Sequence, residues 1–258
     1  MKLRRHHLGH HLGHRLGHRL VGTLAVFGAV ALCNPAFGFS SGAPEGFTAS
    51  PASMGASCVL CHASFALNSG PGSVSILDLP ALYVPDETYS LRVRVEDPAR
   101  VGAGFELSVE DPTGVFTGDL AVTDAVNTRS AGGAIVNYIT HTSSGKANAI
   151  ADWAALGNAA EFTIQWTAPP ADAGEIGFYA AGAAINNGTS NSNDDVYTTT
   201  ELRQAAGPGD LNGDGAIDTA DLGALISAFG TADPVADINN DDIVDIADLG
   251  ILIGAFGP

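Results

Sequence analysis

The sequence predicts a mainly β fold: an immunoglobulin-like antiparallel β-sandwich followed by a small all-α calcium-binding domain. Residues 74–205 contain short alternating or β-branched segments, separated by turn residues and without a long helical period. Residues 210–258 contain a duplicated acidic loop, and each copy precedes an apolar pattern of helical spacing. We therefore divide the chain into a leader at 1–38, a β-sandwich domain at 39–205 and a calcium-binding domain at 206–258.

The leader has the plan of a secretory signal peptide. Residues 1–19 contain five basic residues, six histidines and no acid, and an apolar segment from Leu20 to Leu32 follows. With thirteen residues this segment is short for a membrane span. We expect cleavage near Gly38 and a mature chain without a membrane span. The predicted location is extracytoplasmic: the periplasm, the cell surface or the medium.

The residues after position 38 are strongly acidic. They include six basic residues against 28 acidic ones, which gives a formal net charge of −22. Such a surface repels phosphate backbones and anionic headgroups, so we expect neither nucleic acid nor a lipid surface as a partner. The same residues retain two cysteines, Cys58 and Cys61, and two histidines, His62 and His141. Candidates for a metal centre are therefore few.

Residues 58–62 read C-V-L-C-H, the C-x-x-C-H pattern of covalent haem c attachment. Two thiols at this spacing can add to the two vinyl groups of one haem, and the adjacent imidazole can ligate the iron. A zinc site would require a second pair of ligands nearby, and a thioredoxin-like pair would require a βαβ context; the flanking sequence offers neither. The motif predicts one haem c, attached through Cys58, Cys61 and His62.

The second axial ligand of the iron has several candidates. We predict bis-histidine coordination by His62 and His141, with an open site or a site ligated by Lys146 as alternatives. Met54 lies close to Cys58 in sequence and would have to reach round to the opposite face of the haem. Five aromatic residues either wall the haem pocket or belong to the core: Tyr138, Trp153, Trp166, Phe178 and Tyr179.

The β-rich region divides into at least six predicted strands. Residues 88–95 alternate, which places Tyr89, Leu91, Val93 and Val95 on one face. The other predicted strands are 104–110, 134–141, 161–166, 175–180 and 196–202, with a helical turn near 149–156. Turn residues separate them, among them the Asp-Pro pairs at 97–98 and 111–112. The length of this region suffices for one hydrophobic core.

Several short motifs recur in this region in a fixed order. They include C-x-x-C-H at 58–62, Y-V-P at 83–85, G-F-E at 104–106, I-T-H-T at 139–142, W-T-A-P at 166–169, G-F-Y-A-A-G at 177–182 and D-V-Y at 195–197. In these motifs the chain resembles the reelin-domain-like bacterial surface module called the choice-of-anchor V domain, over about residues 41–203. The resemblance implies a secreted protein with an interchangeable C-terminal anchoring or sorting module. It implies no defined biochemical activity.

The C-terminal residues contain two copies of one loop at an offset of 27 residues. In each copy, oxygen-bearing side chains occupy loop positions 1, 3, 5, 9 and 12 and a backbone carbonyl is available at position 7, as in an EF-hand loop. This ligand set favours Ca²⁺, so we predict two Ca²⁺ ions. The predicted ligands are Asp210, Asn212, Asp214, Ala216, Asp218 and Asp221 in the first loop, and Asp237, Asn239, Asp241, Ile243, Asp245 and Asp248 in the second.

Each loop is followed by apolar residues at positions i, i+3, i+4 and i+7, which predicts one amphipathic helix per loop. These residues are Leu222, Leu225, Ile226 and Phe229, then Leu249, Leu252, Ile253 and Phe256. Gly230 and Gly257 are the predicted stops. This tail resembles a type I dockerin, which implies a cohesin-like or other envelope protein as its partner. The familiar Ser-Thr recognition pairs are replaced by Thr219-Ala220 and Ile246-Ala247.

These features predict an exported c-type mono-haem protein that transfers electrons or senses redox state outside the cytoplasm. Its dockerin-like module would attach it to an assembly in a calcium-dependent manner. Two axial protein ligands favour electron transfer over catalysis, so we do not expect an enzyme; the redox partner is unknown. The alternatives are a non-catalytic adhesion or binding module at the cell surface, or an accessory protein of a polysaccharide-degrading complex. In both alternatives Cys58 and Cys61 form a disulfide.

Overall fold

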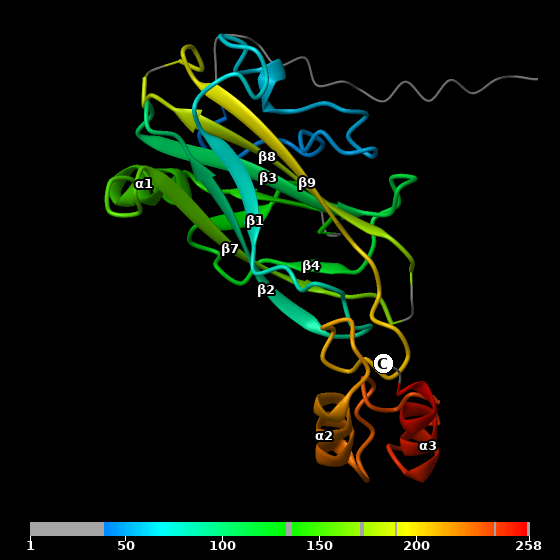
Figure 1. The fold of residues 1–258 in the computed structure, drawn as a ribbon. Helices are drawn as coiled ribbons and strands as arrows, with labels where there is room; N and C mark the ends of the chain where they lie inside the picture. The colour runs from blue at the N-terminus through cyan, green and yellow to red at the C-terminus, as the bar shows by residue number, and fades with distance from the viewer. Residues whose placement is uncertain (1–38, 133–135, 171–172, 189, 240, 257–258) are drawn as a thin grey trace, which may run out of the picture. The chain divides into compact units, whose positions relative to one another are not determined.

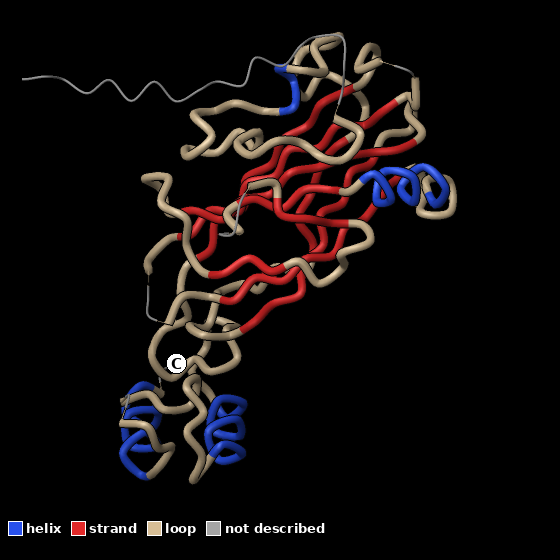
Figure 2. Tube along the Cα trace, turned by 180° about the vertical axis from the view of Figure 1, so that it is seen from behind, coloured by secondary structure: helices blue, strands red, loops and turns tan. Residues whose placement is uncertain are grey.

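A computed structural model describes residues 39–258, except 133–135, 171–172, 189, 240 and 257–258. The predicted signal peptide, residues 1–38, lies outside the described residues. Within them the chain is mainly β, with two antiparallel sheets and three α-helices (Figures 1 and 2). The mainly β prediction is confirmed.

One sheet has four strands in the order β1-β2-β7-β4, and the other has five in the order β5-β6-β3-β8-β9. The strands are β1 Ser73–Leu77, β2 Thr88–Glu96, β3 Gly102–Glu110, β4 Asp119–Ala121, β5 Thr128–Ser130, β6 Tyr138–His141, β7 Ala159–Thr167, β8 Ile176–Ile185 and β9 Asp195–Arg203. The predicted strands occur at or close to their expected positions. The helix expected near 149–156 begins earlier, as α1 Ser143–Asp152, because the Thr142 side chain accepts the Gly145 N–H and caps it.

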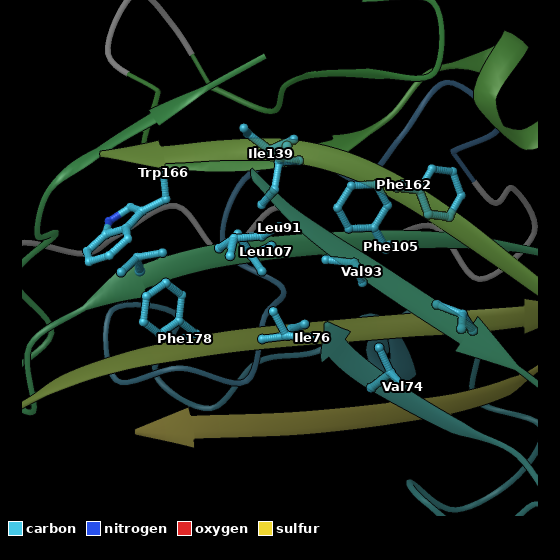
Figure 3. Close-up of a cluster of buried hydrophobic side chains, with 14 of the residues drawn as sticks. Val74, Ile76, Leu91, Val93, Phe105, Leu107, Ile139, Phe162, Trp166 and Phe178 are labelled. Atoms are coloured by element: carbon cyan, nitrogen blue, oxygen red, sulfur yellow. The ribbon is translucent and has the colours of Figure 1, made fainter. Parts of the chain in front are cut away.

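The main hydrophobic core lies between the two sheets. Alternate residues of β2, namely Leu91, Val93 and Val95, are buried, and Tyr89 packs against them as the alternation predicts. Facing strands contribute large rings, such as Phe105 and Phe162, whose centroids are 4.5 Å apart (Figure 3). A stacked aromatic pair of this kind adds about 0.5–1.5 kcal/mol beyond its buried area.

Strands β3 and β8 are buried along their whole length. A sheet with one wet face would leave every second residue exposed, so the outer face of this sheet must also be covered. Residues 43–62 provide the cover: the Phe47 N–H donates to Glu106, and the Ala52 N–H donates to Glu110 Oε2 at 2.8 Å. The C-x-x-C-H segment therefore packs outside the sandwich core, on the outer face of the five-stranded sheet.

Glu106 makes the stability of this cover depend on pH. Its side chain is fully buried and its Oε1 has no hydrogen-bond partner; burial raises the pKa of its carboxyl from 4.5 to about 8. The folded state thus keeps a proton that the unfolded state releases. The stabilising contribution is complete below about pH 4.5 and is lost as the pH rises through about 8.

We expect Glu106→Gln to remove most of this dependence, because glutamine resembles the protonated acid. The measurement is the midpoint of urea unfolding of residues 39–258 at about pH 5 and about pH 8. Glu87 is exposed, so Glu87→Gln is the matched control. This variant should show the same difference between the two unfolding midpoints as the parent. If the difference between the two unfolding midpoints were the same in Glu106→Gln as in the parent, this carboxyl would not be the titrating group.

The C-terminal residues form two loop–helix units, with helices α2 Thr219–Ala228 and α3 Ile246–Ala255. Each helix begins with a capping box, formed by Asp218 with Asp221 and by Asp245 with Asp248. The two predicted helices are confirmed. Leu225 and Leu252 are fully buried in a small core of their own, which Leu222 and Leu249 border. The other four predicted apolar positions are 40–59% exposed: Ile226, Phe229, Ile253 and Phe256.

The second loop has backbone strain that the first one avoids. Asp242 has φ +70° at loop position 6, and its counterpart Gly215 has φ +89°. The left-handed region costs an ordinary residue about 1–2 kcal/mol, and an aspartate somewhat less. We expect Asp242→Gly to stabilise the C-terminal units by about 1 kcal/mol and Gly215→Asp to destabilise them by a similar amount. Urea unfolding followed through the helical signal tests this, and a less stable Asp242→Gly variant would contradict it.

Candidate functional site

Residues singled out in the sequence come together around one cavity of about 260 Å³. Cys58, Cys61, His62, His141 and Lys146 all line it. The first three belong to the segment on the outer face, His141 ends β6, and Lys146 lies in α1. Its walls also include apolar residues, among them Phe39, Phe47, Phe105, Ala183 and Ile185, and polar residues, among them Ser40, Asn187, Ser190 and Asn191.

The aromatic residues suggested as walls do not line this cavity, although the structure describes all five. Trp153, Trp166 and Phe178 belong to the sandwich core, so the core interpretation is the correct one for them. The reason is that the cavity lies on the outer face of the five-stranded sheet, whereas these side chains point between the sheets. Met54 is 81% exposed and does not line the cavity either.

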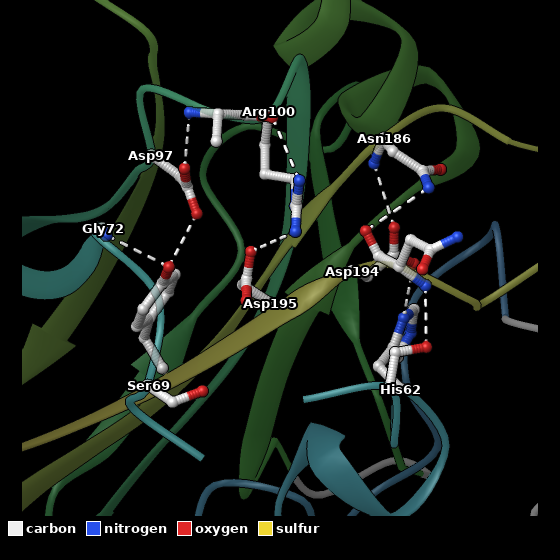
Figure 4. A network of polar contacts seen from close by, with 12 residues as sticks. His62, Ser69, Gly72, Asp97, Arg100, Asn186, Asp194 and Asp195 are labelled. Carbon is white, nitrogen blue, oxygen red and sulfur yellow. Dashed lines mark hydrogen bonds and ion pairs between the residues drawn. The ribbon is translucent and has the colours of Figure 1, made fainter. Parts of the chain in front are cut away.

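His62 is held by a buried carboxylate. Its Nδ1 lies 2.8 Å from Asp194 Oδ2, and the Asp194 side chain is only 3% exposed. The other carboxylate oxygen accepts the Asn186 N–H at 2.9 Å (Figure 4). Because Nδ1 is engaged, Nε2 is the ring nitrogen that remains for a metal. A histidine that donates Nδ1–H to a carboxylate is the usual arrangement of a protein metal ligand.

The connection between β8 and β9 fixes the same segment at two further points. Asn191 Nδ2 donates to the Cys61 carbonyl, and the Asn193 N–H donates to Ser64 Oγ at 2.7 Å. The sequence analysis singles out neither these residues nor Asp194. More than a hundred residues separate His62 from Asp194, and no spacing pattern in the sequence links them.

The two cysteines differ in state. Cys58 is a free thiol, whereas Cys61 is disulfide-bonded, so the two are not joined to each other. The Cys58–Cys61 disulfide of the alternative functions is therefore wrong in this structure. Cys58 is partly buried and packs instead against an apolar cluster that includes Ala183 and Ile185.

The surroundings of the Cys58 thiol disfavour its reactive, ionised form. Burial, followed by the nearby charge of Glu106, raises its pKa to about 12. Since the thiolate is the reactive form, the thiol adds poorly to any electrophile once the segment has folded. Covalent modification of Cys58 would therefore have to precede folding of this segment.

His141 is buried and neutral. The residue is 7% exposed, and burial lowers the pKa of its imidazole to about 4. The pairing of β3 with β6 ends at Glu106 and Thr140, and His141 Nδ1 accepts the next N–H, that of Phe105, at 3.1 Å. A Cβ at Gly104 would lie 2.3 Å from Cε1 of this ring, so only glycine leaves room for it.

The two acidic loops repeat the same backbone contacts. Asp210 accepts the N–H groups of Gly213, Asp214 and Gly215, and Asp237 accepts those of Asp241 and Asp242. At position 12, Asp221 and Asp248 are fully buried. Among the described residues, no group of three or more His, Cys, Asp or Glu side chains is close enough to hold a metal ion. The two calcium sites therefore stay a prediction.

No family model and no curated protein sequence matches the chain. Among solved structures it is similar to reeler domains. The Reelin-N domain of F-spondin is 15% identical, with a TM-score of 0.39 over 58% of this chain and 97% of that one. The human F-spondin reeler domain is 16% identical, with a TM-score of 0.38 over 55% and 95%.

A further similar structure is AvmM, described as catalysing macrocyclization in alchivemycin A biosynthesis. It is 11% identical, with a TM-score of 0.33 over 55% of this chain and 92% of that one. At these scores the similarities support no statement about function. None of the described helices is both long and apolar enough to cross a membrane.

Proposed function

We propose that residues 58–62 attach one haem c and that the protein is an exported carrier of single electrons, or a redox sensor, outside the cytoplasm. One observation carries this proposal: the cysteines and histidines that follow the predicted leader all line one cavity, and a buried carboxylate orients His62. Chance placement of a C-x-x-C-H motif would not bring the second histidine to the same cavity.

The residues present suit this group. The apolar wall suits a macrocycle, and Lys146 with the polar residues of the β8–β9 connection suits its carboxylates. When bound, the haem supplies a one-electron couple. His62 Nε2 would ligate the iron, and Asp194 would make this imidazole a stronger donor by accepting its Nδ1–H.

Attachment of the haem would consist of two addition reactions, one for each cysteine. The S–H bond of each cysteine would add across one vinyl group to give one thioether, with no net oxidation and no leaving group. Both cysteines must enter this reaction as thiols, so a thiol reductant of the export compartment would have to keep Cys61 reduced. Cys58 must react before its segment folds, because its thiol pKa is about 12 in the folded chain.

The charge of the protein favours a basic redox partner. A formal net charge of −22 after residue 38 would attract a cationic surface and speed its encounter at low salt.

The C-terminal units are proposed to bind two Ca²⁺ ions and to attach the protein to a cohesin-like or other envelope protein. The supporting observation is the repeated ligand pattern, in which each loop ends in a buried aspartate.

A redox titration tests the proposed function. Residues 39–258, exported from a host with c-type haem maturation, should show a reversible change of the visible spectrum with a one-electron slope. The midpoint of this titration should depend on Asp194, which touches His62, and not on residues remote from it. A loaded protein whose iron cannot be cycled reversibly would rule out both electron transfer and redox sensing.

A further inference from the structure

The hydrogen bonds around His141 determine where its ring carries its proton. The Phe105 N–H donates to Nδ1 at 3.1 Å, so Nδ1 acts as an acceptor. The only other described groups near Nδ1 are the Phe105 carbonyl and Thr140 Oγ1, each at 3.4 Å, which is long for a hydrogen bond.

Both of these neighbours already have partners. Thr140 Oγ1 donates its proton to the Phe105 carbonyl at 2.6 Å and accepts the Ala43 N–H at 3.1 Å. Neither group needs a donor from the ring, whereas the Phe105 N–H needs an acceptor. A neutral histidine has one N–H, so the proton of His141 lies on Nε2.

The ring presents this N–H to the cavity. Gly104 holds the ring in place, because the ring occupies the space that a side chain at position 104 would take. Three atoms of the His141 ring lie within 2.8 Å of the position of a Cβ at Gly104. Nε2 makes no hydrogen bond within the described residues and is not among their buried polar atoms without a partner. Since His141 lines the cavity, its free nitrogen is reached from there.

We propose that His141 is not the second axial ligand but a hydrogen-bond donor, and that the iron keeps an open position for a small ligand that accepts a hydrogen bond, such as a diatomic gas. This inference rests on the proposed haem. An iron ligand needs a lone pair on Nε2, which would move the proton to Nδ1 and leave the buried Phe105 N–H without its acceptor. The structure favours a donor, and this points to a sensor that binds its signal.

The first test is independent of haem. In the protein before haem loading, long-range ¹H–¹⁵N correlation spectra of the histidine rings should show His141 with an unprotonated Nδ1 and a protonated Nε2. His62, with Nδ1 against Asp194, should show the opposite tautomer and is the internal control. A protonated Nδ1 in His141 would overturn the inference.

The second test uses carbon monoxide as the probe on the ferrous, haem-loaded protein. The parent should be five-coordinate and bind CO without displacing a protein ligand. His141→Leu should stay five-coordinate and shift the C–O stretching band to higher wavenumber, and His141→Gln should restore part of the shift. A merely structural role for His141 would leave that band unmoved.

Three other results would overturn the inference, and each has a different meaning. A six-coordinate ferrous parent that becomes five-coordinate in His141→Leu would establish bis-histidine ligation and overturn the inference, while leaving the haem proposal intact. The same change in Lys146→Gln would overturn it in favour of the lysine. A chain without covalent haem, recognised by its mass, would instead overturn the proposed function and the open iron position with it.

Discussion

Asp194→Asn should raise the reduction potential of the attached haem by roughly 60–120 mV. The Asp194 carboxylate lies 2.8 Å from His62 Nδ1 and is almost fully buried, so its charge would stabilise the oxidised state of an iron ligated by this imidazole. Loss of such a partner typically weakens a metal site about 10–100-fold. For a one-electron couple, each tenfold change in the ratio of the affinities for oxidised and reduced iron corresponds to about 59 mV.

The chain offers a matched control for this prediction. Asp195 is the next residue, is also buried, and pairs with Arg100 rather than with the cavity. Asp195→Asn should lower stability without moving the potential by more than a small fraction of the Asp194 effect. Spectroelectrochemical titration of the three proteins is the measurement. Equal shifts in the two variants would mean that Asp194 acts only through general charge.

Removal of calcium should unfold the C-terminal units of residues 206–258. Each loop carries four predicted ligand carboxylates within twelve residues, and the sequence contains no basic residue after Arg203 to offset them. With Ca²⁺ at about 1,000 times its Kd, each site contributes about 4 kcal/mol, which is comparable to the stability of a small domain. We therefore expect a chelator to abolish the signal of α2 and α3.

Limited proteolysis of residues 39–258, with Ca²⁺ and with EDTA, gives the clearest measurement. Cleavage after residue 206 should accelerate at least about 100-fold in EDTA, while the β-sandwich stays intact. Asp221→Ala and Asp248→Ala each remove one buried carboxylate and provide single-site controls. Equal cleavage rates in Ca²⁺ and EDTA would contradict the calcium prediction.

Strands β2 and β7 could be predicted because alternate residues of each are buried. The alternation of β2 led directly to Leu91, Val93 and Val95, which are fully buried. The short strands β1, β4 and β5 have three to five residues, too few for a distinctive period. Strand β8 continues to Ile185 through small residues whose intrinsic strand preference is low, because neighbouring strands pair with it on both sides.

The site could be predicted only where chemistry is encoded locally. The motif identified Cys58, Cys61 and His62, and elimination identified His141. The contributions of Asp194 and Gly104 come from strands and turns far away in sequence, and a carboxylate or a glycine carries no local signal of its partner. The same limit applies to the position of the cavity: only the structure shows that residues 43–62 cover the outer face of the five-stranded sheet.

The most direct test of the central claim is the intact mass and visible spectrum of residues 39–258, exported from a host with c-type haem maturation. We predict a mass increased by one haem that survives acid denaturation and reduction, together with the spectrum of a haem bound through two thioethers. A colourless protein with the mass of the polypeptide alone, obtained under the same maturation, would contradict the account and favour a non-catalytic adhesion or binding module.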